Sequence, residues 1–240
     1  MTVSAKQNWT GTGTGSSVAS EPLAFANVPI AGNLLVCYAE LGNSGGTGGI
    51  GDDIGDSVSW SQFAIKANAT EGVKCYGWWK VVGTPSGGGK TVTVSASPNE
   101  PISLVIAEYQ SSVGGITWGL NGTAIQTSGS GSNPALGTIS MSGDPSTVNS
   151  FISSDTAVAT AGAGFTRQTT VTHFGDDAVE DLFTTGTSQA VAWVGSLGNW
   201  TGLAGAFKAA TGAGGGSMIP IFALILDGLG GGRQHGNRLH

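Results

Sequence analysis

The chain has 240 residues, a formal net charge of −6 and only 10% charged residues. Because its Lys and Arg residues are few and form no cluster, the sequence excludes the basic surface that nucleic-acid binding requires. Glycine accounts for 42 residues, about 18% against a usual ~7%, yet a hydrophobic content of 39% is too high for a disordered chain.

The N-terminal segment carries no targeting signal. Its first 20 residues lack the apolar stretch of a signal peptide, and no segment of the chain reaches the ~18 apolar residues that a membrane-spanning helix needs. We therefore expect a protein that is made in the cytoplasm and has no membrane partner.

Short β-prone segments separated by Gly, Ser, Asn and Pro run through the chain. In the stretch TVTVSAS, Val92 and Val94 alternate with polar residues, which is the period of a strand with one wet face. We predict about eleven strands and no helix, in an antiparallel β-sandwich. The expected strands are Leu23–Phe25, Asn33–Leu41, Ser57–Lys66, Val73–Val82, Lys90–Ser95, Ser103–Gln110, Thr138–Met141, Thr147–Ser154, Gln168–Thr172, Gln189–Ser196 and Gly202–Lys208.

The core of this sandwich is predicted from the apolar positions of these strands, with alternate members on opposite faces. The expected core residues are Leu34, Val36, Val105, Ile106, Tyr109, Trp193 and Phe207. Cys37 and Cys75 lie in apolar runs, and we expect buried thiols, with one disulfide as the alternative.

Two adjacent tryptophans, Trp78 and Trp79, stand in the run GVKCYGWWKVVG. Neighbours in a strand point to opposite faces, so we expect one of them in the core. The other should cover a neighbouring strand, a loop or another subunit. The alternative is an aromatic contact, either a stacking platform for a sugar or an anchor at an interface.

The loop GIGDDIGDS places Asp52, Asp53 and Asp56 within five residues among glycines. Such a backbone can gather carboxylate oxygens round a hard cation, so a Ca²⁺ site is one hypothesis, although the spacing is not that of an EF-hand. A plain solvated turn is the alternative. The sequence indicates no other cofactor.

Further carboxylates form no recognisable catalytic motif. Glu40, Glu108 and other scattered carboxylates are the candidates for a glycosidase pair, which needs two acids at one sugar site. A second acidic group is expected either to converge on one point or to keep a loop solvated, and it comprises Asp176, Asp177, Glu180 and Asp181. We predict no catalytic residues and no enzyme.

The C-terminal part departs in composition from the rest. We expect the sandwich to occupy residues 1–209, and residues 210–240 to form a Gly-rich linker and an apolar arm, Met218–Leu229. The arm is too short to span a bilayer and too apolar to stay in water. It either folds back onto its own sandwich or docks on another subunit by adding a strand to a sheet edge. The predicted interface residues are Met218, Ile219, Ile221, Phe222, Leu224, Ile225 and Leu226.

A series of motifs occurs in one order along the chain: Ala31–Val36, Asp56–Trp60, Cys75–Trp79, the run Ile102–Tyr109 with its ending IAEY, and Trp200 followed by Ala206–Lys208. This pattern of turn glycines and core aromatics, over about residues 3–209, resembles the jelly-roll β-sandwich proteins of tailed bacteriophages. Those domains serve as capsid decoration or tail adhesion modules, and no catalytic residues come with the resemblance. The Gly-rich insert at 42–55 and the tail after 210 depart from the pattern.

The resemblance and the arm together imply a non-enzymatic structural or assembly protein of a virion, a capsid decoration or minor structural subunit. Its partners would be copies of itself and other shell or tail proteins. The alternative is a glycan-binding adhesion module of a phage tail or cell surface. An exposed tryptophan beside Asp52–Asp56 would favour glycan binding, and subunit contacts made by the arm would favour assembly.

Overall fold

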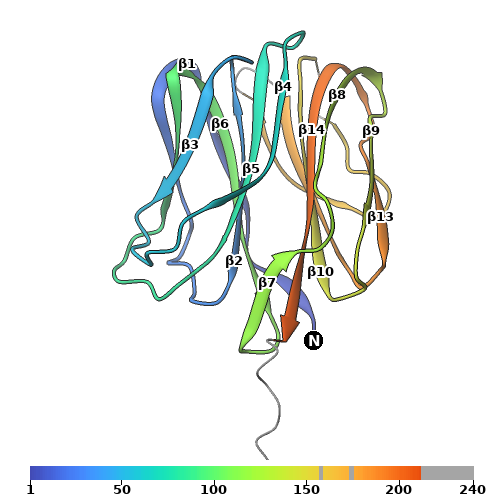
Figure 1. The fold of residues 1–240 in the computed structure, drawn as a ribbon. Helices are drawn as coiled ribbons and strands as arrows, with labels where there is room; N and C mark the ends of the chain where they lie inside the picture. The colour runs from blue at the N-terminus through green and yellow to red at the C-terminus, as the bar shows by residue number, and fades with distance from the viewer. Residues whose placement is uncertain (157–158, 173–175, 212–240) are drawn as a thin grey trace, which may run out of the picture.

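The computed structural model describes residues 1–156, 159–172 and 176–211. Within these ranges the chain forms fourteen strands and no helix (Figure 1). Most strands pair in two large antiparallel sheets, A and B, which pack face to face. The predicted all-β antiparallel sandwich is therefore confirmed.

Sheet A is built from the N-terminal half of the chain, in the order β1-β6-β2-β5-β4, with β3 paired to β6. Its strands are β1 (Val3–Ala24), β2 (Leu34–Leu41), β3 (Thr47–Asp52), β4 (Ser61–Asn68), β5 (Val73–Val81) and β6 (Thr91–Ser111).

Sheet B is built from the C-terminal half, in the order β11-β12-β10-β14-β7, with β8 paired to β14. Its strands are β7 (Ile116–Leu120), β8 (Ile125–Ser132), β10 (Ser146–Ser154), β11 (Thr166–Thr172), β12 (Asp176–Thr184) and β14 (Ser196–Thr211). A separate two-stranded sheet pairs β9 (Ala135–Ser140) with β13 (Ser188–Ala192).

The inter-sheet core lies between sheets A and B and is rich in aromatic rings. The ring of Tyr38 on β2 stacks on that of Phe151 on β10, with centroids 5.5 Å apart, and lies 5.8 Å from that of Trp9 on β1. The Tyr38 hydroxyl donates a hydrogen bond of 3.1 Å to the Asn149 carbonyl. Stacked aromatic pairs of this kind contribute beyond their buried area, so Tyr38 ties the two sheets together.

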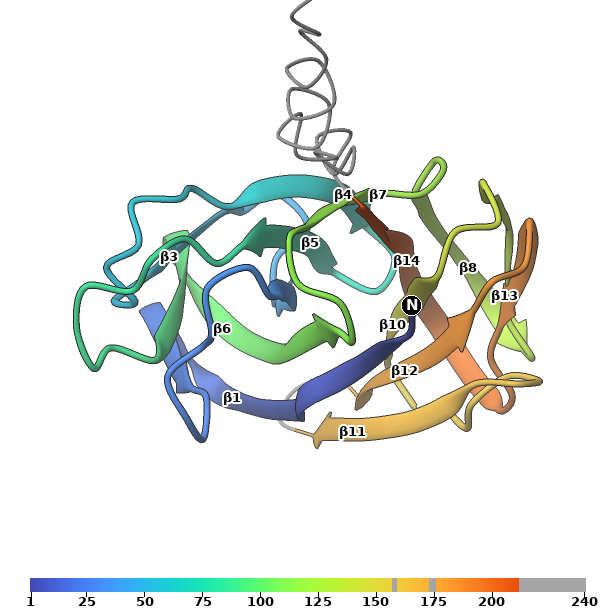
Figure 2. The same cartoon turned by 90° about the horizontal axis from the view of Figure 1, so that it is seen from below.

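The outer face of sheet A is covered by strands of the same sheet. β1 and β6 are 22 and 21 residues long, and their pairing register shifts between Thr14 and Ser20, which is typical of a β-bulge where strands bend. The first half of β6, the second half of β1 and β3 therefore form an extra layer (Figure 2). Val92 and Val94 of this layer pack with Leu35 of β2 in what we call outer core A.

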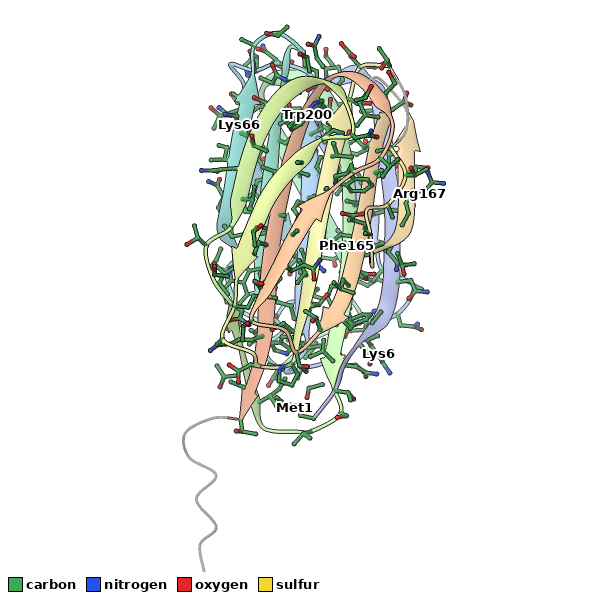
Figure 3. All side chains as sticks on the ribbon, turned by 90° about the vertical axis from the view of Figure 1, so that its right-hand side faces the viewer. Met1, Lys6, Lys66, Phe165, Arg167 and Trp200 are labelled. Carbon is green, nitrogen blue, oxygen red and sulfur yellow. The ribbon has the colours of Figure 1, made fainter. Side chains whose placement is uncertain are left out.

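The outer face of sheet B is covered by the β9/β13 sheet, on the side of the molecule that Figure 3 presents. Ile139 of β9 and Val191 of β13 pack there against Val148 of β10, in what we call outer core B. Trp193 is fully buried in it, and its indole Nε1 donates a hydrogen bond of 2.8 Å to Ser150 Oγ. Because both sheets are covered on both faces, every residue of β2 and β10 is buried.

Two glycines in central strands are explained by one aromatic ring. A Cβ atom added to Gly77 on β5 would lie 2.6 Å from Phe63, and one added to Gly205 on β14 would lie 2.7 Å from the same ring. Phe63 of β4 also meets Phe207 edge-on, with centroids 5.2 Å apart. The absence of a side chain at these two positions lets the Phe63 ring lie between the sheets.

The predicted strands agree best with the observed strands where the sequence is apolar. All seven predicted core residues are at most 1% exposed, and Val105 and Ile106 face different cores. Lys90–Ser95 and Ser103–Gln110 were expected as two strands, but they are the two halves of β6. Most of β1, and all of β3, β8 and β12, were missed because their residues are mainly Gly, Ser, Thr or acidic, and β7 was missed because it is only five residues long.

The two cysteines are free and buried, as predicted. Cys37 faces outer core A and Cys75 faces the inter-sheet core, so the β2–β5 sheet separates the two thiols and the alternative disulfide is wrong. Burial raises the pKa of both thiols, which keeps them protonated.

β14 ends at Thr211, two residues beyond the expected domain boundary. The predicted arm and its seven interface residues lie outside the described residues.

Candidate functional site

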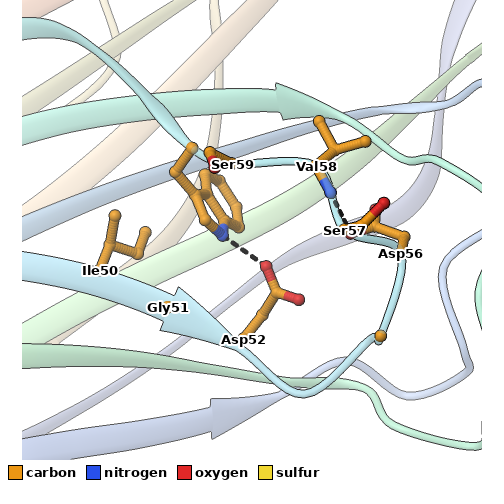
Figure 4. A pocket seen from close by; sticks show the side chains of 9 residues that line it. Ile50, Gly51, Asp52, Asp56, Ser57, Val58 and Ser59 are labelled. Atoms are coloured by element: carbon orange, nitrogen blue, oxygen red, sulfur yellow. Dashed lines mark hydrogen bonds between the residues drawn. The ribbon is translucent and has the colours of Figure 1, made fainter.

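The acidic loop between β3 and β4 borders an open pocket of about 400 Å³, which we call the Trp60 pocket (Figure 4). A volume of this size falls within the range of small-ligand sites in proteins. The residues that line it are Ile50, Gly51, Asp52, Gly55, Asp56, Ser57, Val58, Ser59 and Trp60.

The acidic loop gathers its carboxylates round a cation, but that cation is a lysine. Lys80 Nζ, at the end of β5, lies 2.8 Å from Asp52 Oδ2 and 2.7 Å from Asp56 Oδ1. The side chains of Lys80, Asp52 and Asp56 are 0%, 8% and 2% exposed. The hypotheses of a Ca²⁺ site and of a solvated turn are both corrected, because a buried ammonium group already pairs with the two acids in the place that a metal ion would take.

Asp53, the third residue of the predicted metal site, points elsewhere. Its Oδ1 accepts a hydrogen bond of 2.7 Å from the backbone N–H of Thr91. Within residues 1–156, 159–172 and 176–211, no group of three or more His, Cys, Asp or Glu side chains is placed to hold a metal ion.

Asp56 is the most strongly anchored residue of the loop. Its Oδ2 accepts a hydrogen bond of 2.9 Å from the N–H of Gly83, and its Oδ1 accepts one of 3.2 Å from the N–H of Val58. Burial favours the neutral form of Asp56, but the hydrogen bonds from Lys80, Gly83 and Val58 outweigh it and hold its pKa below the ordinary value. Asp56 is therefore ionised at neutral pH and fixes the shape of the loop.

Trp60 stands at the start of β4 and is half-buried. Its indole Nε1 donates a hydrogen bond of 2.6 Å to Asp52 Oδ2, and Lys80 Nζ lies 5.7 Å from its ring centroid. The ring thus has a fixed orientation beside the acidic loop. Sequence reasoning missed both Trp60 and Lys80 as site residues, although one lysine in the apolar run after two tryptophans was a signal for a buried ion pair.

Trp78 and Trp79 face opposite sides of sheet A, as the strand period predicts. Trp78 is 4% exposed and stacks on Tyr76 in outer core A, with centroids 4.9 Å apart. Trp79 is half-buried at the inter-sheet core, where its ring lies 5.8 Å from that of Phe207. The proposed aromatic contact is corrected, because the chain's own strands cover Trp78 and the opposite sheet contacts Trp79.

The hypothetical glycosidase pair is not assembled. Glu40 lies on the inter-sheet face of sheet A, because it follows Tyr38 by two residues, whereas Glu108 shares the outer face with Ile106. In the β2–β6 register Glu40 stands opposite Ser103, five positions from Glu108. One sugar cannot contact both carboxyl groups.

The second acidic group is a buried part of β12 rather than a solvated loop. Asp177, Glu180 and Asp181 are at most 3% exposed. Asp181 Oδ2 accepts a hydrogen bond of 3.1 Å from the Tyr109 hydroxyl, and Glu180 Oε2 accepts one of 2.8 Å from the N–H of Gly162. Both expectations, convergence on one point and a solvated loop, are wrong. Neighbouring residues of β12 face opposite sides of its sheet, so these acids point into two different cores.

Three carboxyl groups, Glu40, Glu71 and Asp177, form a buried carboxyl cluster where β2, β12 and the β4–β5 turn meet. Ser103 donates a hydrogen bond to Asp177, and Ser153 Oγ donates one of 3.0 Å to Glu71 Oε1. Neither oxygen of Glu40 has a hydrogen-bond partner, and none of the ion pairs between described residues includes the cluster. The cluster therefore has no basic side chain of the described chain to neutralise it.

Burial raises the pKa of several carboxyl groups, both in this cluster and at Glu180. It raises the pKa of Glu71 to about 7 and that of Glu180 to about 8. Burial, together with the neighbouring Asp177, raises the pKa of Glu40 well above its ordinary value. Such groups remain protonated in the fold at a pH at which the unfolded chain has released its protons.

We expect the folded chain to be more stable at pH 5 than at pH 8. From an ordinary value of 4.5 up to the raised values of about 7 and 8, the folded state binds more protons, so stability falls as the pH rises. A loss of about 1 kcal/mol would lower the melting temperature by about 3 °C in a domain of this size. Calorimetry across this pH range measures the slope, which the double variant Glu71→Gln, Glu180→Gln should flatten. An equal or higher melting temperature at pH 8 would contradict the expectation.

One end of the molecule carries most of the exposed apolar side chains. Here the N-terminus, the β6–β7 loop and the end of β14 meet, since Val3 pairs with Ser111 and Ile116 pairs with Thr211 (Figures 1 and 3). Five of the eight exposed large hydrophobic residues of the described chain form what we call the end surface: Met1, Ile30, Val113, Leu120 and Phe183.

Two depressions flank this end surface, one of about 240 Å³ beside Met1 and Phe183 and one of about 200 Å³ beside Val113. Exposed apolar side chains gathered at one end of a molecule are typical of interaction sites.

The described residues include no helix of the length and apolarity needed to cross a membrane. Comparisons of the chain with protein-family models, with characterised proteins and with solved structures found no match.

Proposed function

We propose that the chain is a non-enzymatic structural and assembly protein of a phage particle, a capsid decoration or minor structural subunit that attaches through the arm Met218–Leu229. The observation that carries this proposal is the end surface, because it places exposed apolar side chains at the point where β14 ends. The resemblance to phage sandwich proteins supplies the kind of particle.

The distance along the chain favours contact between the arm and such a surface. Only six residues, 212–217, separate Thr211 from Met218, and six residues span at most ~20 Å. Burying each large apolar side chain of the arm is worth ~1.5–3 kcal/mol. With so short a linker, the arm can reach exposed apolar side chains either of its own chain or of a neighbouring copy.

The described residues already build three hydrophobic cores, whose members among these residues lie between Val3 and Ala209. β7, a sheet-edge strand beside the end surface, offers backbone groups to which an added strand could pair. We therefore assign the arm to contacts between chains, either with identical subunits or with another shell or tail protein.

The triple substitution Ile221→Ser, Leu224→Ser, Leu226→Ser is expected to leave the sandwich folded and to abolish assembly. The reason is that the arm loses its apolar surface while the three cores keep theirs. Circular dichroism and thermal melting measure folding, and sedimentation velocity and co-purification with particles measure assembly.

The matched control changes three polar residues of the same tail, Arg233→Ser, Asn237→Ser and Arg238→Ser, and should assemble like the wild type. A triple variant that unfolds would place the arm in its own domain's core. One that remains fully assembled, or a wild-type chain that is monomeric and absent from particles, would refute the proposal.

A further inference from the structure

The Trp60 pocket has a recognition chemistry that the acidic loop alone would not suggest. Lys80 pairs with both Asp52 and Asp56, so the three side chains keep a formal net charge of −1, which disfavours an anionic ligand. The carboxylate oxygens already accept hydrogen bonds from Lys80, from the Trp60 indole and from the backbone N–H groups of Ile54, Val58 and Gly83. They therefore leave no free oxygen for a cationic ligand, and the chemistry of the pocket suits a neutral one.

The aromatic wall of the pocket is held in place before any ligand arrives. The hydrogen bond from Trp60 Nε1 to Asp52 and the position of Lys80 beside the ring fix the orientation of the indole. A side chain that is already immobilised loses little conformational entropy on binding. Among the tryptophans of the described residues, Trp60 lines this pocket while it also packs against outer core A, whereas Trp78 and Trp79 do not line it.

The polar wall is supplied by the turn that follows Asp56. Ser57, Val58 and Ser59 are exposed and line the pocket, so two serines stand at its wall (Figure 4). Ser57 has a φ of 57°, and among the described residues only Asn133 shares this left-handed conformation without being glycine. Strained backbone of this kind is concentrated at ligand sites, and here Asp56 anchors it on both sides.

We propose that the Trp60 pocket binds a neutral saccharide. The apolar C–H face of a pyranose would pack on the Trp60 ring, and its hydroxyl groups would bond to Ser57 and Ser59. A neutral polyhydroxylated ring is the ligand class that uses a fixed aromatic surface and uncharged hydroxyls together. This proposal does not depend on the arm, since every residue it uses lies between Ile50 and Gly83.

The test is binding of the full chain to an array that carries neutral oligosaccharides ending in glucose, galactose or N-acetylglucosamine, beside sialylated and sulfated ones. We expect binding to neutral members, with the affinity of the best one then measured by calorimetry. Trp60→Ala should weaken it at least tenfold. Ser57→Gly and Ser59→Ala, which leave the aromatic wall and the ion pairs intact, should each weaken it severalfold.

Phe183→Ala, at the distant end surface, is the matched aromatic control and should bind like the wild type. Thermal melting of each variant separates loss of binding from loss of folding, and the two serine variants decide the matter if Trp60→Ala unfolds. No binding to any neutral member, binding to anionic members alone, or undiminished binding by both serine variants would overturn the proposal.

Discussion

Replacing Lys80 by methionine is expected to destabilise the fold by about 3–5 kcal/mol, the usual cost of removing one partner from a buried ion pair. Methionine keeps the length and volume of the stem but leaves Asp52 and Asp56 facing each other without a cation. Both carboxylates are nearly inaccessible to water, so solvent cannot replace the ammonium group. Urea unfolding followed by circular dichroism measures the loss.

Two further variants separate this effect from a general loss of charge. Lys208→Met removes the partner of Asp144 in an ion pair whose side chains are 33% and 42% exposed, so it should cost less than about 1 kcal/mol. Adding Asp52→Asn and Asp56→Asn to Lys80→Met should restore part of the stability, because no buried charge remains. A loss below about 1 kcal/mol for Lys80→Met alone would show that the loop opens to water.

Phe207→Ala is expected to cost about 3–5 kcal/mol, because truncation of a fully buried aromatic residue removes its apolar surface and leaves a cavity. The ring contacts Phe63 and Trp79, both from sheet A, so its loss weakens the contact between the two sheets. Denaturant unfolding measures the change.

Phe183→Ala is the control for the same chemical change at a surface position. Phe183 is 42% exposed, and its ring meets that of Tyr109 at 5.9 Å, so we expect a loss well below that of Phe207→Ala. If both variants lose the same free energy of unfolding, Phe207 of β14 does not stabilise the contact between the two sheets as its ring contacts indicate.

The sequence by itself determined the class of fold and five residues of the inter-sheet core, Leu34, Val36, Val105, Tyr109 and Phe207. Apolar runs predicted β2, β5 and the second half of β6, the alternation of Val92 and Val94 predicted its first half, and the strand period placed Trp78 and Trp79 on opposite faces. These inferences succeeded because the direction of neighbouring side chains in a strand depends only on local backbone geometry.

Tertiary structure decided which of those faces are covered, and by what. β10 reads as polar, with Ser and Asn at half its positions, yet all its residues are buried because the β9/β13 sheet lies over its outer face. In the same way, the outer position of Trp78 became a core position once the first half of β6 folded across sheet A.

The candidate site was also decided by contacts between distant residues. Asp52 and Asp56 are 28 and 24 positions from Lys80, and only the pairing of β5 beside the loop turns a predicted metal site into an internal ion pair with a pocket beside it. Local sequence specifies how a strand alternates, whereas the partner of each buried charge depends on which strands pack together. The sequence therefore determined the sandwich, and the packing of its layers determined the Trp60 pocket.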